Sequence, residues 1–217
     1  MKYKVITIEK NPQSVASAQR CIDSAAKYGI EVKMVAAFTP ENNPREHFSN
    51  QRLPLKHFEK DAQQYSRIEN VLSAFLSHFN LWRYAASLKE ETCILEHDAY
   101  FFDGIPDNLS YKGILTIGKP SYGRFKTPST FGVGPLVHKR YFGGAHAYCV
   151  TPSGANQLLE KAKTEAGPTD IFMNINNFPN LEEYYPWPVE ARDSFSTIQK
   201  KEGCLAKHGY NDSYELI

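Results

Sequence analysis

Residues 2–37, KYKVITIEKNPQSVASAQRCIDSAAKYGIEVKMVAA, decide the fold class. The stretch begins with an alternating, β-rich segment over residues 2–8 and ends with a second one over residues 30–37. Between them, apolar positions at helical spacing predict a helix that is capped by Ser14 and ends near Tyr28, just before a glycine. A strand, a helix and a second strand form a β-α-β unit, which implies a parallel strand pair with a right-handed crossover.

The rest of the chain continues this alternation of strands and helices. Short apolar runs predict strands over residues 92–95, 114–117 and 145–150. Apolar residues three and four apart predict a long helix over residues 66–89, and Thr151 followed by Pro152 predicts the cap and first turn of a helix that ends near Glu165. We therefore expect an α/β fold with a mixed, mainly parallel sheet flanked by helices, in a single domain over residues 1–217.

Two polar segments interrupt the periodic pattern. Residues 39–61 contain three prolines and are predicted to be a long irregular segment. Residues 118–144 are rich in glycine, proline, tyrosine and basic residues, which predicts an active-site loop. Loops of this length in a compact domain are often functional.

Composition excludes several classes of protein. Lys and Arg total 25 and Asp and Glu total 24, so the formal charge of +1 disfavours a strongly basic nucleic-acid binder and an acidic disordered chain. No run approaches the roughly 18 apolar residues that a membrane-spanning helix needs, and the start of the chain reads as a strand rather than a secretory signal. The four cysteines form no CxxC pair, and Cys93 and Cys149 lie in apolar runs. These features predict core cysteines, no zinc site and a reducing, cytoplasmic compartment.

Polar residues follow the apolar strand that is predicted over residues 92–95. Glu96 and Asp98 are two residues apart, so in an extended segment their side chains would project to the same side. In open α/β sheets, ligands bind beyond the carboxyl ends of strands. One carboxylate could meet a hard cation such as Mg²⁺ or Mn²⁺ and the other a ribose hydroxyl. A solvated acidic strand end is the alternative.

The segment ILEHDAYFF, residues 94–102, resembles the acidic motif of glycosyltransferase family 25, whose members act on lipooligosaccharide and on collagen hydroxylysine. Further similarities follow in the family's order: Ser77-His78 with Trp82, the run Gly143 to Ala155, Pro168-Thr169-Asp170, Tyr185 to Val189, and Ser196-Thr197-Ile198. The chain departs from the family pattern at Ser73 and Ala74, which replace Gly and Cys, and at His97, which replaces an Asp.

The resemblance implies a GT-A-type, Rossmann-like fold and a set of site residues. It implies Asp98 as a metal ligand, Glu96 at the nucleotide ribose or the metal, Gly143 and Gly144 against the donor sugar, Asp170 as the base on the acceptor hydroxyl, His208 as a late metal ligand, and Ser77 and His78 as donor-site support. Each has a structural alternative. Asp170 could cap a helix over residues 171–176, His78 could be a buried helix histidine, and His208 could lie on the surface.

Basic and aromatic residues of the loop 118–144 are candidates for substrate contacts. Arg124, Lys126, Lys139 and Arg140 could neutralise a diphosphate or guide an anionic acceptor, or could be solvated. Tyr122, Phe125, Phe131, Tyr141 and Phe142 could form a stacking platform or fold the loop onto the body.

The resemblance therefore predicts an inverting, Mn²⁺- or Mg²⁺-dependent transfer of a sugar from a UDP-linked donor to an acceptor hydroxyl, with a lipooligosaccharide-type glycan as the first choice of acceptor. A hydroxymethylated base of DNA and a protein hydroxyl are alternative acceptors, and a catalytically silent binding protein is an alternative from another class. A nucleotidyltransferase is disfavoured, because residues 9–14 after the first strand contain no glycine.

Overall fold

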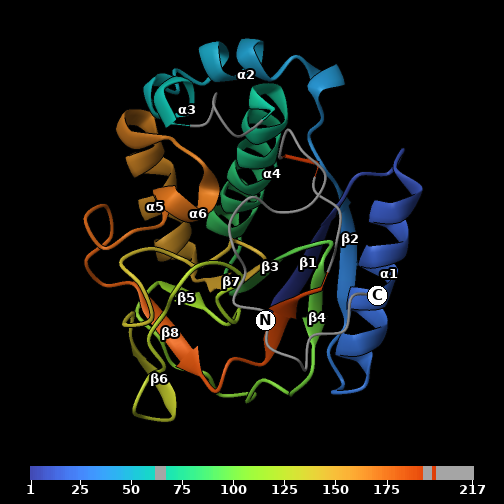
Figure 1. The fold of residues 1–217 in the computed structure, drawn as a ribbon, viewed down its shortest axis with the longest axis vertical. Helices are drawn as coiled ribbons and strands as arrows, with labels where there is room; N and C mark the ends of the chain where they lie inside the picture. Colours follow the sequence, from blue (N-terminus) through green and yellow to red (C-terminus); the bar gives the residue numbers. More distant parts are fainter. Residues whose placement is uncertain (62–66, 193–196, 199–217) are drawn as a thin grey trace.

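The computed structural model describes residues 1–61, 67–192 and 197–198 (Figure 1). Its centre is a seven-stranded sheet in the order β2-β1-β3-β7-β5-β8-β6, and a two-stranded sheet pairs β4 with β9. The strands are β1 (Lys2–Thr7), β2 (Val32–Ala36), β3 (Thr92–Glu96), β4 (Ala99–Phe101), β5 (Ile114–Thr116), β6 (Gly132–Pro135), β7 (Ala147–Val150), β8 (Glu182–Tyr185) and β9 (Val189–Ala191).

Most strands of the main sheet point in the same direction. β1 is parallel to β2 and β3, and β5 is parallel to β8. β7 runs antiparallel between β3 and β5, and β6 runs antiparallel along β8 at the edge. The predicted α/β class with a mixed, mainly parallel sheet is therefore confirmed.

The expected β-α-β unit is present, with α1 (Pro12–Ala26) between β1 and β2. Its cap is Asn11, whose side chain accepts hydrogen bonds from the amides of Gln13 and Ser14. The expectation that Ser14 is the cap was wrong, because the Ser14 hydroxyl instead accepts the amide of Ile8 at 2.9 Å. Ser14 therefore ties the end of β1 to the first turn of α1.

Helices cover both faces of the sheet (Figure 1). In β3, Cys93 and Leu95 pack on the side of α1, whereas Ile94 packs on the side of α4 (Ile68–Ser87) and α5 (Pro152–Glu165). This alternation is the period of two that a strand imposes on its side chains. The helices predicted over residues 66–89 and from Thr151 are confirmed, and the Thr151 hydroxyl accepts the Gly154 amide at 3.0 Å as a cap.

The segment 39–61 is more regular than expected. It contains the 3₁₀ helix η1 (Pro40–Asn42) and the helices α2 (Pro44–Asn50) and α3 (Lys56–Asp61). Two of its prolines begin helices, where the missing amide hydrogen costs nothing. Phe48 of α2 is 1% exposed and packs edge-on against Phe58 of α3, so these helices close the core over α4. The prediction of an irregular segment was therefore wrong.

The segment 118–144 also contains an element that the sequence did not predict. β6 pairs with β8 through Val133 and Tyr184 and forms one edge of the sheet. Glycine and proline at both ends of β6 hid this short strand from a periodicity argument. The segment is therefore an ordered part of the fold that contributes an edge strand to the sheet.

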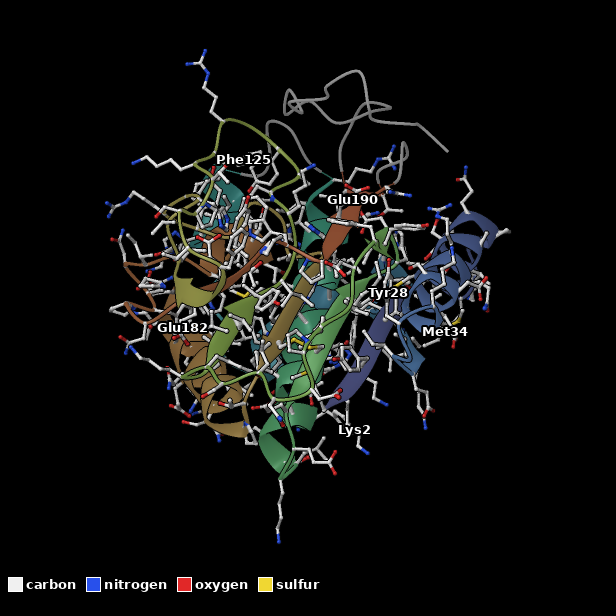
Figure 2. All side chains as sticks on the ribbon, turned by 90° about the horizontal axis from the view of Figure 1, so that it is seen from below. Lys2, Tyr28, Met34, Phe125, Glu182 and Glu190 are labelled. Carbon is white, nitrogen blue, oxygen red and sulfur yellow. A yellow bond between two sulfur atoms is a disulfide. The ribbon has the colours of Figure 1, made fainter. Side chains whose placement is uncertain are left out.

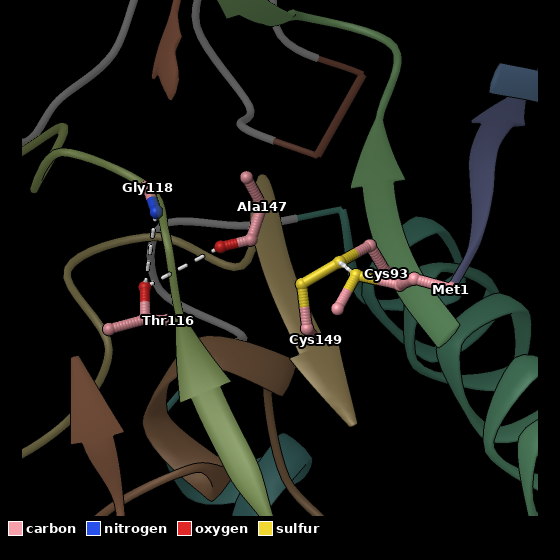
Figure 3. Close-up of a disulfide and its surroundings, with 6 residues drawn as sticks. All are labelled: Met1, Cys93, Thr116, Gly118, Ala147 and Cys149. Carbon is pink, nitrogen blue, oxygen red and sulfur yellow. Dashed lines mark hydrogen bonds between the residues drawn. A yellow bond between two sulfur atoms is a disulfide. The ribbon is translucent and has the colours of Figure 1, made fainter. Parts of the chain in front are cut away.

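Two of the cysteines are paired. Cys93 of β3 and Cys149 of β7 are direct partners across the antiparallel ladder and form a disulfide in the interior of the sheet (Figure 3). Both are fully buried, so the prediction of core cysteines is confirmed, and the disulfide between them was not predicted. A reducing, cytoplasmic compartment stays a prediction. Among the described residues, no helix combines the length and apolarity that crossing a membrane requires.

Candidate functional site

The polar residues singled out in the sequence gather where β1, β3 and β5 end. Because these strands are parallel to one another, their carboxyl ends meet at one end of the sheet. Figure 2 shows Phe125 and Glu190 at this end of the molecule and Lys2, the first residue of β1, at the other. This is the side on which α/β sheets bind ligands.

Glu96, the last residue of β3, is held by a chain of hydrogen bonds that reaches into the core. The indole nitrogen of Trp82 donates to the Tyr148 hydroxyl at 2.7 Å, and this hydroxyl lies 2.9 Å from Nδ1 of His78. Nε2 of His78 lies 3.1 Å from Oε1 of Glu96. Because the Tyr148 hydroxyl accepts from Trp82, it can donate its own proton to Nδ1, which leaves the His78 proton on Nε2 to bind Glu96.

This arrangement keeps Glu96 ionised. Burial alone would raise the pKa of Glu96, but the hydrogen bond from His78 and the field of the nearby imidazoles of His146 and His97 lower it overall. A carboxylate that stays ionised and is fixed in orientation suits a cation or a ribose hydroxyl. The structure thus places His78 directly against Glu96, at the position where donor-site support was predicted.

His97 and Asp98 form a turn between β3 and β4 and do not continue the strand. The premise that Glu96 and Asp98 share one side of an extended segment was therefore wrong. Glu96 faces His78 on α4, whereas the charge of Asp98 acts on Cys21 of α1. Nδ1 of His97 lies 3.1 Å from the Ser14 hydroxyl, so the residue that replaces the family's middle acid binds the first turn of α1.

The glycine pair before β7 is required by close packing. A Cβ atom on Gly143 would lie 2.6 Å from the side chain of Pro120. Gly144 has φ +126°, and a Cβ there would lie 2.7 Å from both the Ser121 hydroxyl and Nδ1 of His146. The pair therefore lets residues 118–121 pack directly against the start of β7. Contact of Gly143 and Gly144 with a donor sugar stays a prediction.

His146 lies between these two backbone segments and is 1% exposed. A Cβ on Gly118 would lie 2.5 Å from Nε2 of His146. Neither ring nitrogen has a hydrogen-bond partner in the part of the chain that the structure describes. Burial lowers the pKa of His146 to about 4, against the opposing fields of Glu96 and Glu190, so the ring is neutral at pH 7.

Asp170 lies in the first turn of α6 (Thr169–Phe172), after the helix N-cap Pro168. The alternative role of Asp170, as the cap of a helix over residues 171–176, was wrong, because α6 begins two residues earlier, at Thr169, and ends at Phe172. One carboxylate oxygen accepts the Ile171 amide at 2.9 Å, and the other accepts the Tyr122 hydroxyl at 2.5 Å. Tyr122 thus connects the segment 118–144 to α6.

The surroundings of Asp170 shift its pKa in the direction opposite to the shift of Glu96. Burial raises the pKa of Asp170, the hydrogen bonds from Tyr122 and Ile171 oppose this change, and the charge of Glu96 adds to it. Since the charge of Glu96 acts on Asp170, the two carboxylates lie in the same neighbourhood. A raised pKa moves Asp170 in the direction that suits a group that accepts a proton.

Lys139 is the one cation of the segment 118–144 on which the charge of Asp170 acts, among the shifts resolved for the described residues. Its ammonium group donates to the Tyr122 carbonyl and lies 4.4 Å from the centre of the Tyr122 ring and 5.3 Å from that of Tyr141. Arg140 donates to the side chain of Asn176, while Arg124 and Lys126 are exposed. Lys139 and Arg140 therefore both donate hydrogen bonds within the protein.

The aromatic residues of this segment do not form a single platform. Tyr122 stacks on Tyr141, Phe142 is buried, Phe125 packs against Trp187, and the exposed Phe131 stacks on Tyr185. The prediction of one stacking platform was therefore wrong, and its alternative, folding of the loop onto the body, describes most of these side chains. Only the Tyr122–Tyr141 pair lies beside Asp170.

Ser77 and His208 are the two remaining predicted site residues. Ser77 is buried on α4, where its hydroxyl accepts the Phe38 amide at 2.8 Å and donates to the Ser73 carbonyl at 2.9 Å. It connects the end of β2 to α4, and direct donor support by Ser77 stays a prediction. His208, the predicted late metal ligand, lies outside the described residues.

The described residues contain no cluster of three or more His, Cys, Asp or Glu side chains that could hold a metal ion unaided. Mg²⁺ and Mn²⁺ in nucleotide sites are commonly held by one or two carboxylates together with substrate phosphates. Glu96 ends β3 and Asp98 lies in the turn that follows, so two acidic oxygen donors of the type that such a site uses lie within three residues of the chain. They do not fit a site formed entirely by protein ligands.

Several site residues could not be found from the sequence. Tyr122 and His146 carry no motif, and Glu190 acts on His146 from β9, which is distant in sequence. Lys119 and Arg192 both approach Glu190, with nitrogen–oxygen distances of 4.0 and 2.5 Å. The only signal was the position of His146 inside the glycine-containing run that carries the family resemblance.

A cavity of about 510 Å³ lies away from this site, at the start of β5. It is lined by Gly113 and Ile114, by Gln157 and Lys161 of α5, and by Asn180. Gly118, beside His146, lies beyond the other end of β5. The cavity is therefore separate from the carboxylates and does not define the candidate site.

A comparison with models of known protein families identifies the family of this chain. The family model for "Glycosyltransferase family 25 (LPS biosynthesis protein)" matches residues 5–133. Among solved structures, mouse xyloside xylosyltransferase 1 in its apo form is similar at 12% identity, with 83% of each chain covered and a TM-score of 0.45. No curated protein matches the chain. Because the family model covers more than half of the 217 residues, this protein belongs to glycosyltransferase family 25 and is a glycosyltransferase.

Proposed function

We propose that this glycosyltransferase transfers a sugar from a UDP-linked donor to an acceptor hydroxyl, with inversion and with the help of Mn²⁺ or Mg²⁺. One observation carries the proposal: Glu96, which is bound by His78, and Asp170, which is bound by Tyr122, interact through their charges, and their surroundings shift their pKa values in opposite directions. Such a pair separates an ionised binding group from a proton acceptor. Glu96 takes the first role and Asp170 the second.

Glu96 and Asp98 are the residues that would hold the cation. When bound, a divalent cation neutralises charge that develops on the leaving diphosphate. His78 orients Glu96 through its hydrogen bond of 3.1 Å, so the carboxylate is in place before the donor arrives. His208 remains a proposed further ligand on the basis of the family resemblance.

Asp170 is the proposed base. The acceptor oxygen forms a bond to the anomeric carbon of the sugar while the bond from that carbon to the diphosphate oxygen breaks. The acceptor proton passes to a carboxylate oxygen of Asp170, and the electron pair of the broken bond leaves with UDP. The raised pKa of Asp170 brings it closer to that of a base that works near neutral pH.

A glycan of the lipooligosaccharide type is the proposed acceptor, which the description of the matching family supports. A hydroxymethylated DNA base would need a positive surface for the phosphate backbone. Of the four basic residues considered for it, Lys139 and Arg140 bind Tyr122 and Asn176 within the protein. Arg124 and Lys126 remain exposed, so the preference for the glycan rests on the description of the matching family.

Calorimetry with UDP and Mn²⁺ tests this function directly. The wild type should bind UDP more tightly with Mn²⁺ present, and Asp98→Ala should lose the metal-dependent part. Binding without release of UDP from any UDP-sugar in the presence of lipooligosaccharide would support the silent binding protein. Full metal-stimulated activity in Asp98→Ala would contradict the assigned metal site.

A further inference from the structure

A buried ionic network lies behind the glycine pair and has no place in the mechanism above. Its centre is Glu183 of β8, which is 2% exposed. One of its carboxylate oxygens accepts the amides of Val137 and His138, at 2.5 and 3.0 Å. The other lies 2.8 Å from Nδ1 of His138 and accepts the indole N–H of Trp187 at 3.1 Å. Four donors therefore surround one interior carboxylate.

His138 transmits this arrangement to the glycine pair. The Gly143 amide donates to Nε2 of His138 at 3.2 Å, so Nε2 must be an acceptor and the ring proton must be on Nδ1. That proton points at Glu183, which fixes the tautomer. The Gly143 carbonyl in turn accepts the Ser121 amide at 2.6 Å and its hydroxyl at 3.1 Å.

The network stabilises the ionised form of Glu183. Burial would raise its pKa, but the hydrogen bonds from His138 and from the Val137 amide, together with the field of His138, lower the pKa overall. A buried carboxylate is costly unless its oxygens are satisfied, and here all four hydrogen bonds come from residues that lie around one loop. The sequence offered no motif for either Glu183 or His138.

We propose that Glu183 and His138 are positioning residues for donor-sugar binding, because they hold the Gly143 peptide in place through a fixed imidazole tautomer. This inference rests on the proposed function and on the prediction that Gly143 and Gly144 lie against the donor sugar. Neither positioning residue needs to touch the substrate. Their effect passes through a single hydrogen bond to the Gly143 amide.

Glu183→Gln is the decisive variant, because glutamine has the same shape as glutamate but replaces one accepting carboxylate oxygen with a donating NH₂ group. If the amide oxygen of Gln continues to accept the two backbone amides, its NH₂ group faces Nδ1 of His138. Two donors then meet, and His138 relieves the conflict by moving its proton to Nε2, which opposes the Gly143 N–H. If the side-chain amide of Gln is turned the other way, its NH₂ group faces the backbone amides of Val137 and His138, which are donors as well. Trp187→Phe is the matched control, because it removes one donor to Glu183 and leaves the tautomer unchanged.

Two measurements separate positioning from a general loss of structure. Long-range ¹H–¹⁵N correlation spectra should show His138 protonated at Nδ1 in the wild type and Trp187→Phe, and at Nε2 in Glu183→Gln. Calorimetry with Mn²⁺ should compare UDP with whichever of UDP-glucose, UDP-galactose and UDP-N-acetylglucosamine the wild type binds most tightly. Glu183→Gln should bind the UDP-sugar about tenfold more weakly, equivalent to about 1.4 kcal/mol, and should bind UDP unchanged.

The failures are distinguishable. If Glu183→Gln keeps the Nδ1 tautomer, or binds the UDP-sugar as well as the wild type does, the positioning role is wrong even though the proposed function stands. An equal loss of affinity for UDP and UDP-sugar would also overturn it, since that indicates a general disturbance of the site. If the wild type binds no UDP-sugar, the proposed function fails and the donor-positioning role fails with it. In that case the NMR spectra still test whether Glu183 fixes the tautomer of His138.

Discussion

At the scale of single residues, Asp170 gives the sharpest test of the chemistry. Asp170→Asn keeps an oxygen that can accept a hydrogen bond from the Ile171 amide or the Tyr122 hydroxyl, but it cannot take up the acceptor proton. We expect kcat to fall about 10²- to 10⁴-fold, the usual contribution of a general base. Affinity for UDP with Mn²⁺ should stay unchanged, which calorimetry can measure. Retained turnover in Asp170→Asn would remove Asp170 from the base role.

Tyr122 should set the pH at which this base works. Its hydroxyl donates to Asp170 and lowers the pKa of that carboxyl against the effect of burial. Tyr122→Phe removes this donor, so the pKa of Asp170 rises further. Activity that requires the ionised carboxylate is lost as the pH falls through its pKa, so the acid limb of the kcat/KM profile should move to higher pH. An unmoved acid limb would mean that Asp170 is not the titrating base.

The sequence indicated the residue types of the site better than their geometry. Glu96, Asp98, His78 and Asp170 were found by resemblance, and the structure brings His78 against Glu96 and the field of Glu96 to Asp170. The hydrogen bond from Tyr122 to Asp170 and the buried position of His146 were not found, because each depends on contacts with residues far away in the chain. Periodicity reports only on residues that are neighbours along one helix or strand. It carries no information on the hydrogen bond between Tyr122 and Asp170, which are 48 residues apart in the sequence.

At the scale of elements, the contact between α4 and β7 supports Glu96. Tyr148→Phe removes the hydroxyl that joins Trp82 to His78 and leaves two buried polar groups without their partner. We expect a loss of about 2 kcal/mol in the free energy of unfolding and a fall of roughly 4–8 °C in Tm. Thermal unfolding measured by circular dichroism provides the test.

Tyr84→Phe is the matched control for Tyr148→Phe. Tyr84 lies on the same helix but is 37% exposed, and its contact with Lys4 is made through the ring. This variant should leave Tm within about 1 °C of the wild type, since surface substitutions rarely change stability by more than about 0.5 kcal/mol. Equal effects of the two variants would show that the Trp82–Tyr148–His78 chain contributes nothing specific.

Elements with strong periodicity were predicted well, and short ones were not. α4 and α5 have apolar faces at helical spacing that match their packing on the sheet. β6 and α2 were missed, because four strand residues with two glycines, or a seven-residue helix that begins at a proline, carry no periodic signal. Both exist because tertiary contacts complete them: β6 through its ladder with β8, and α2 through Phe48 in the core.

At the scale of the whole molecule, His146 should make stability depend on pH. Burial lowers the pKa of His146 to about 4, below its ordinary value of 6.5. The unfolded chain therefore binds a proton at a higher pH than the folded chain does. The stabilisation is complete above about pH 6.5 and is lost as the pH falls towards 4, by about 3 kcal/mol in total. The carboxylates of Glu96 and Glu183 have lowered pKa values, so their contributions are lost at more acidic pH.

Urea unfolding at intervals between pH 7 and pH 4 measures this dependence, and His146→Leu supplies the comparison. Imperfect packing of leucine between Gly118 and Gly144 lowers stability at every pH, whereas the loss of the imidazole removes the titrating group. The difference in slope between the two proteins is therefore the informative quantity. A wild-type slope that persists in His146→Leu would place the titration elsewhere. It would also mean that the imidazole beside Glu96 is hydrated or hydrogen-bonded in solution, and thus accessible to a ligand at the end of β3.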